Sequence, residues 1–127
     1  MKLRLRNNSI RFRLTQSEVA RLAEDGTVEE AINFGPLPTE ALTYVLSASA
    51  DSDAIKAEFN GERIEVFIPK TAVDLWSSTD QVGIEAVQNI DNGKLQILIE
   101  KDFRCLEPRT GGDDEDTFPN PQQCVAK

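Results

Sequence analysis

The chain has 127 residues, of which 39 % are hydrophobic and 28 % charged, a length and composition that suit one globular domain. Its 14 basic and 22 acidic residues leave a net charge of −8, which argues against general nucleic-acid binding, because that affinity comes mainly from neutralising phosphates with Lys and Arg. The absence of histidine excludes Ser-His and Cys-His catalytic pairs within the chain. No apolar run suits a membrane span or a signal peptide, so we expect a cytoplasmic protein without a membrane partner.

The first 14 residues predict a β-hairpin with one basic face. In residues 2–6 and again in 10–14, apolar side chains alternate with cations, and successive side chains of a strand point to opposite faces. Asn7, Asn8 and Ser9 between these segments suit a tight turn. The cations that would share the basic face are Lys2, Arg4, Arg6, Arg11 and Arg13.

A helix is expected after this hairpin. Thr15 and Glu18 have the spacing of a capping box, in which each side chain satisfies an otherwise unpaired backbone donor. Val19 and Leu22 fall on one apolar side of the helix, and Gly26 is well placed to end it in a left-handed conformation.

From Thr27 onward a period of two predicts further strands at residues 28–34, 40–48, 55–59, 63–68, 82–90 and 94–103. Asn60-Gly61 predicts a hairpin with a type I′ turn. A short helix opening at residues 71–74 would bury Leu75 or Trp76. The expected fold is therefore α+β, with seven to eight strands in a mainly antiparallel curled sheet or partly open barrel, one helix after the first hairpin and one short helix.

The carboxyl-terminal part changes in character, so we expect an ordered core at residues 1–106 and a loop-rich acidic tail at 107–127 within a single domain. The run Asp113–Asp116 suits a solvated surface more than a calcium loop, because its acids are contiguous. For Cys105 and Cys124 we expect free thiols, with a disulfide and metal ligation left open.

The basic face allows two interpretations. Arginine binds phosphate or carboxylate through paired hydrogen bonds, so these five cations could form an anion site. Alternatively, carboxylates from later strands neutralise them, as cross-strand charge pairs commonly do, and we prefer this second interpretation. Glu85, Glu100 and Asp102 are the candidate internal partners, and Glu100 and Asp102 are also the candidate ligands of a divalent ion.

The chain also resembles a small uncharacterised bacterial protein family over nearly its full length. The resemblance lies in residues 2–19, in Trp76 before Val82-Gly83, and in the words Glu-Lys-Asp-Phe-Arg-Cys-Leu at 100–106 and Phe-Pro-Asn-Pro at 118–121. That family has no assigned reaction or ligand, so the resemblance implies a bacterial single domain and supplies no catalytic residues.

These observations favour a binding or interaction domain without catalytic activity or cofactor. Its partner would be a protein or a small anionic ligand, met through the basic hairpin and the 107–121 loop. The alternative is an enzyme or sensor for phosphorylated small molecules, with the five cations holding the anion and the carboxylates holding a divalent ion. Neither a catalytic residue nor an oligomeric state follows from the sequence.

Overall fold

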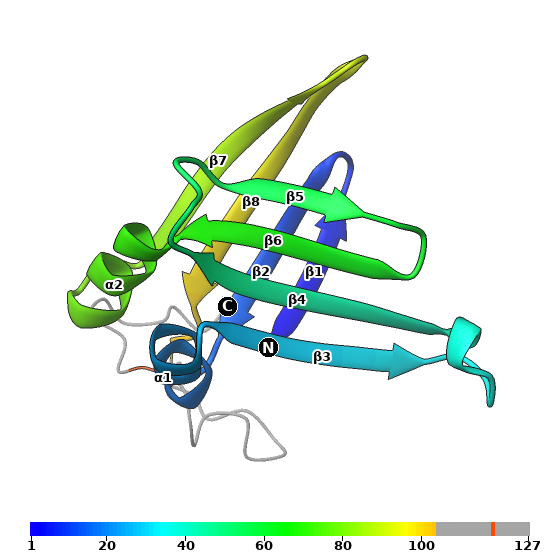
Figure 1. Cartoon of the computed structure of the whole chain (residues 1–127), viewed down its shortest axis with the longest axis horizontal. Coiled ribbons are helices and arrows are strands. Elements are labelled where there is room, and N and C mark those ends of the chain that lie inside the picture. Colours follow the sequence, from blue (N-terminus) through cyan, green and yellow to red (C-terminus); the bar gives the residue numbers. More distant parts are fainter. Residues whose placement is uncertain (104–117, 119–127) are drawn as a thin grey trace, which may run out of the picture.

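The computed structural model describes residues 1–103 and Phe118 (Figure 1). It contains eight β-strands, two α-helices and one short 3₁₀ helix. The strands are β1 (Lys2–Arg6), β2 (Ser9–Leu14), β3 (Thr27–Asn33), β4 (Ala41–Ser49), β5 (Lys56–Phe59), β6 (Arg63–Pro69), β7 (Gly83–Ile90) and β8 (Gly93–Lys101). The helices are α1 (Gln16–Asp25), η1 (Pro38–Glu40) and α2 (Lys70–Ser78). No helix in the described residues is long and apolar enough to cross a membrane.

The strands form two open four-stranded sheets, not the curled sheet or partly open barrel that we expected. Sheet I has the order β1-β2-β8-β7 and sheet II the order β3-β4-β6-β5. Both sheets are mixed, because β2 pairs with β8 and β4 pairs with β6 in parallel, while the other pairs are antiparallel. The expectation of a mainly antiparallel sheet missed these two central pairs, because they join strands that are far apart in the sequence.

The topology repeats within the chain. Each half of the described chain consists of a hairpin, a helix and a second hairpin, so that β1-β2-α1-β3-β4 is followed by β5-β6-α2-β7-β8. The first hairpin of one half joins the second hairpin of the other half in each sheet. The registers also correspond, because the pair of Lys2 with Arg13 in the hairpin β1–β2 has the same position as the pair of Lys56 with Phe67 in the hairpin β5–β6. The two halves are therefore related by an internal pseudo-two-fold arrangement.

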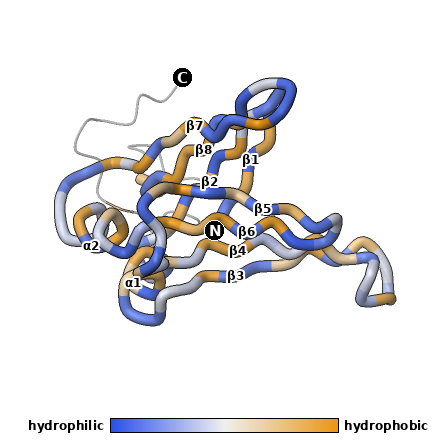
Figure 2. Tube along the Cα trace, turned by 45° about the horizontal axis from the view of Figure 1, so that its top comes forward, coloured by the Kyte–Doolittle hydropathy of each residue, from blue (hydrophilic) through white to orange (hydrophobic). Residues whose placement is uncertain are grey.

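The core lies between the inner faces of the two sheets and under the helices, which sit together at one end of the sheets (Figure 1). Equivalent positions of the two halves contribute equivalent core residues: Leu14 and Ile68 from the central strands, and Val19 and Val73 from the helices, are all buried. Burying this apolar surface is the main favourable term in folding. Figure 2 shows the apolar and polar residues alternating along the strands, as a sheet with one buried face requires.

Local signals in the sequence correspond closely to local structure. The capping box between Thr15 and Glu18 is present, and Gly26 ends α1 with a φ of 83°. The Asn60-Gly61 hairpin is confirmed, but its turn is not type I′, because Gly61 has a positive φ and Asn60 does not. The Asn60 side chain instead accepts hydrogen bonds from the amides of Glu62 and Arg63, a local alternative that asparagine commonly provides.

The second helix begins one residue before the expected range and buries Trp76, not Leu75. Trp76 is fully buried and its indole N–H donates to the Val82 carbonyl at 3.1 Å, whereas Leu75 is 57 % exposed. Successive helical residues point in directions about 100° apart, so only one of the two could enter the core.

Candidate functional site: the basic outer face of sheet I

The five cations predicted to share a face do so in the structure. In sheet I, Lys2 lies opposite Arg13 and Arg4 lies opposite Arg11. The parallel pair of β2 with β8 then places Glu100 beside Arg13. Since side chains alternate along each strand, Arg6 joins this face, which points away from the core. We call it the basic face.

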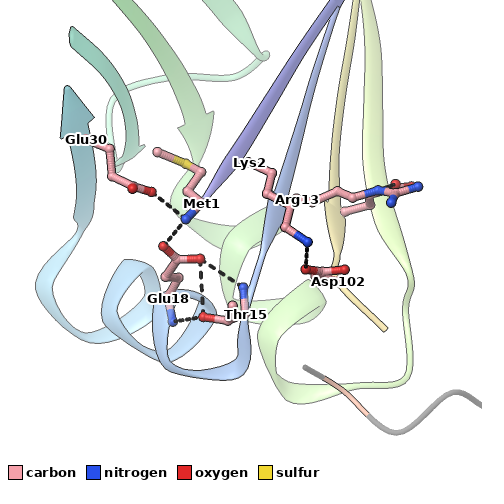
Figure 3. Close-up of polar contacts among 8 residues, drawn as sticks. Met1, Lys2, Arg13, Thr15, Glu18, Glu30 and Asp102 are labelled. Atoms are coloured by element: carbon pink, nitrogen blue, oxygen red, sulfur yellow. Dashed lines mark hydrogen bonds and ion pairs between the residues drawn. The ribbon is translucent and has the colours of Figure 1, made fainter. Parts of the chain in front are cut away.

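Two carboxylates form ion pairs with three of these cations. Glu100 accepts hydrogen bonds at 2.7 Å from the Nε atoms of both Arg11 and Arg13. Asp102, which is buried, contacts the Lys2 ammonium at 3.1 Å, as the dashed line in Figure 3 shows. The expected internal pairing is therefore present for Lys2, Arg11 and Arg13. Glu85, the third candidate partner, makes no ion pair within the described residues.

Arg4 and Arg6 are different. In the described part of the chain, neither guanidinium makes an ion pair or a hydrogen bond. A hollow of about 150 Å³ lies beside Arg4, and its lining consists of cations alone: Lys2, Arg4, Arg11 and Arg13. A larger hollow of about 610 Å³ shares Arg11 and extends over Leu98 toward Glu85. The basic face thus offers unpaired positive charge beside concave space.

The internal repeat provides a comparison within the same molecule. The hairpin β5–β6 occupies in sheet II the place that β1–β2 occupies in sheet I, and there Glu58 stands at the position of Arg4 and Glu65 at that of Arg11. Its charges are mixed and pair locally: Lys56 contacts Glu58 at 3.3 Å, and Arg63 contacts Glu65 at 3.4 Å. The fold therefore does not require a hairpin with cations alone.

The amino group of Met1 holds the start of β1 in place. This ammonium is buried and forms ion pairs with Glu18 of α1 and Glu30 of β3 (Figure 3). Burial by itself lowers the pKa of the Met1 ammonium, but hydrogen bonds and charge attraction from Glu18 and Glu30 outweigh it, so the pKa is raised above its ordinary value. Nothing in the sequence pattern pointed to this cluster, because it joins three separate elements.

The candidate metal ligands Glu100 and Asp102 both contact cations, each with its own partners. Among residues 1–103 and Phe118, no group of three or more Asp, Glu, Cys or His side chains is arranged to hold a metal ion. The tail positions Cys105, Cys124 and Asp113–Asp116 lie outside the described residues, as does the 107–121 loop apart from Phe118.

Lys101 is a buried charged residue that was not among the predicted site residues. Its Nζ donates to the Thr79 carbonyl at 2.7 Å and lies 5.2 Å from the centre of the Phe118 ring. Burial lowers the pKa of the Lys101 ammonium, and attraction from Asp80 opposes this effect only in part. These contacts join the end of β8 to the loop after α2, so we assign Lys101 a structural role.

Comparison with known proteins identifies one family. No curated protein and no solved structure matches the chain significantly. A family model described as a family of unknown function, DUF7009, matches residues 1–122, nearly the whole length. This agrees with the full-length resemblance seen in the sequence. The chain therefore belongs to the DUF7009 family.

Proposed function

We propose that the chain is a non-catalytic interaction domain whose basic face receives an acidic segment of a partner protein. The observation that carries this proposal is the contrast between the two equivalent hairpins. One pairs its charges within itself, while the other holds Arg4 and Arg6 without a counter-ion in the described part of the chain, beside a hollow lined by cations.

The spacing of the unpaired charges matches that of an extended acidic segment. Arg4 and Arg6 lie on the same face two residues apart, which corresponds to about 7 Å along a strand. Side chains that share a face of an extended acidic segment repeat at the same distance. Arg11 and Arg13 have the same spacing and both donate to Glu100 Oε1, so this spacing also allows two arginines to share one anion.

The competing role, an enzyme or sensor for phosphorylated small molecules, has less support. It needs Glu100 or Asp102 to hold a divalent ion, yet both carboxylates already contact cations of the basic face. The chain also has no histidine to act as a general acid or base near neutral pH. An interaction domain needs neither of these groups.

The double variant Arg4→Glu/Arg6→Glu tests the proposal directly. Poly-L-glutamate of about 20 residues serves as the probe, titrated calorimetrically at about 50 mM salt, where screening of exposed charges is moderate. Reversing two charges replaces two attractions with two repulsions, so we expect affinity to fall by about tenfold or more. Arg21→Glu provides a control on α1, since a single charge reversal away from the basic face should have little effect.

Two results would contradict the proposal. In the first, Arg21→Glu weakens binding as much, per charge, as the double variant does, which would show attraction to overall charge and not to this face. In the second, pyrophosphate binds more tightly than poly-L-glutamate and loses its affinity in the double variant, which would favour the small-anion role.

Substituting Glu100 with Gln should strengthen binding. The Glu100 carboxylate lies between Arg11 and Arg13 and repels any anion that approaches them. A charge pair about 4 Å apart is worth about 1 kcal/mol in bulk water, so removing the Glu100 charge should raise the affinity for poly-L-glutamate about fivefold or more. Glu85→Gln is the matched control, since Glu85 lies on the same face but contacts neither arginine. An unchanged or weaker affinity in Glu100→Gln would show that Arg11 and Arg13 do not meet the partner.

A further inference from the structure

The edge of sheet I at β1 has backbone groups that point away from the sheet. Arg6 pairs with Ser9 across a two-residue turn, and residues that flank such a turn exchange hydrogen bonds in both directions. The bonded pairs then alternate along the hairpin, so Leu3 and Leu5 direct their N–H and C=O groups outward. In the described part of the chain, no hydrogen bond satisfies these outward groups.

In sheet II, the equivalent edge has a hydrogen-bond partner at Ala57. At β5, the Ala57 amide donates to Gln88 Oε1 at 2.7 Å, and Gln88 Nε2 donates to the Ala57 carbonyl at 3.1 Å. The Gln88 side chain from β7 thus does for β5 what a neighbouring strand would do. Ala57 stands at the position of Leu3 in the repeat, since Ala57 lies opposite Val66 as Leu3 lies opposite Phe12.

Among residues 1–103 and Phe118, no side chain does this at the edge of β1. Val28 in β3 and Ile84 in β7 hold equivalent positions, because each is buried and pairs with a buried residue of the next strand. Four residues further along these strands are Ile32 in the first half and Gln88 in the second. The side chain of Ile32 cannot form a hydrogen bond, and this residue is 48 % exposed. The Gln88 side-chain amide, which forms hydrogen bonds with the edge of β5, is therefore replaced near the edge of β1 by the exposed apolar side chain of Ile32.

Apolar surface continues around this open edge. Leu5 is 61 % exposed and Phe59 66 % exposed, and together with Ile64 they line a hollow of about 340 Å³ at the open end between the sheets. In Figures 1 and 2 the strands of sheet II extend beyond β1, the edge strand of sheet I. A further strand beside β1 would lie next to this apolar surface.

We infer that β1 accepts an extended segment of a partner protein as a fifth, antiparallel strand of sheet I, with acidic and apolar residues in alternation. The inference rests on the proposed function and specifies its partner. Residues opposite Leu3 and Leu5 would be apolar and face sheet II, while the alternate residues would be acidic and lie beside Lys2, Arg4 and Arg6. Addition of a strand to an open sheet edge combines backbone hydrogen bonds with side-chain selection on each face.

A nine-residue peptide of alternating Val and Glu, labelled with a fluorophore, is the probe, and fluorescence anisotropy measures its affinity. In an antiparallel pair, residues opposite Leu3 and Leu5 exchange hydrogen bonds with them, and these are the Val residues of the peptide. Methylating the Val amide nitrogens should weaken binding about tenfold or more. Methylating the Glu amide nitrogens, the matched control, should change it less than about threefold. Binding should also slow hydrogen exchange of the Leu3 and Leu5 amides about tenfold.

The outcomes separate this inference from the proposed function. Suppose that both methylated peptides bind like the parent peptide and that Leu3 and Leu5 gain no protection, while Arg4→Glu/Arg6→Glu still weakens binding. The inference of an added strand is then wrong, and the proposed role of the basic face in binding is retained. If neither this peptide nor poly-L-glutamate responds to that double variant, both proposals fail. Light scattering provides a further test: a dimer that the double variant dissociates would show that a second copy occupies the edge, and would overturn the peptide partner.

Discussion

Replacing Trp76 with alanine is expected to remove much of the stability of the fold. Trp76 is fully buried on the inner face of α2, and removing a buried tryptophan side chain costs about 3–5 kcal/mol through lost apolar burial and the cavity that remains. The whole stability of a domain is about 5–15 kcal/mol. Urea denaturation followed by circular dichroism should therefore show a much lower midpoint for Trp76→Ala.

Two variants separate the causes of this loss. Leu75→Ala changes the neighbouring residue, which is mostly exposed, and should stay within about 0.5 kcal/mol of the parent chain. Trp76→Phe keeps most of the ring but leaves the Val82 carbonyl without its indole donor, so a loss of about 1–2 kcal/mol is expected. Equal midpoints for Trp76→Ala and Leu75→Ala would contradict the assignment of Trp76 to the core.

The parts of the fold that the sequence predicted well depend on neighbouring residues. The capping box at Thr15 and Glu18, the helix end at Gly26 and the hairpins around Asn7-Asn8 and Asn60-Gly61 all follow from patterns of a few residues. Each of these features is decided by hydrogen bonds or backbone preferences within one turn, so a single sequence contains the necessary information.

The arrangement of the hairpins could not be predicted in the same way. Pairing β2 with β8 brings Phe12 next to Ile99, and pairing β4 with β6 brings Leu46 next to Val66. Any two apolar strand faces could make such contacts, so alternation alone does not select the partner or its direction. The internal repeat was the missing signal, because equivalent apolar positions such as Leu14 and Ile68 recur in the two halves of the chain.

The same distinction between local and long-range features applies to the candidate site. Alternation along the two strands is enough to predict that the five cations share one face, because that result needs only the period of a strand. Which cations are neutralised depends on the register between β2 and β8, which puts Glu100 beside Arg13 and leaves Arg4 and Arg6 one strand further away. Sequence alone therefore located the basic face but could not show which part of it carries unpaired charge.

Stability should also depend on pH through the Met1 ammonium. Glu18 and Glu30 raise the pKa of this group above its ordinary value of 8.0, so the folded chain binds the proton more tightly than the unfolded chain does. The resulting stabilisation is fully present below about pH 8 and is lost as the pH rises through the folded pKa. Urea denaturation between pH 7 and pH 9.5 covers the beginning of this loss and stays below the ordinary pKa of tyrosine, about 10.

Glu18→Gln assigns this pH dependence to the ion pair. Losing a hydrogen-bonded charge partner should cost about 2 kcal/mol at pH 7, and the difference from the parent chain should shrink toward pH 9.5 as the ammonium loses its proton. Comparing variants at each pH cancels the opposite contribution of Lys101, whose lowered pKa makes stability rise as the pH approaches the ordinary lysine value of 10.5. Glu24→Gln, on the exposed side of α1, should show a small difference at every pH. A difference for Glu18→Gln that is the same at pH 7 and pH 9.5 would mean that Glu18 acts through the capping box alone, and not through the amino group of Met1.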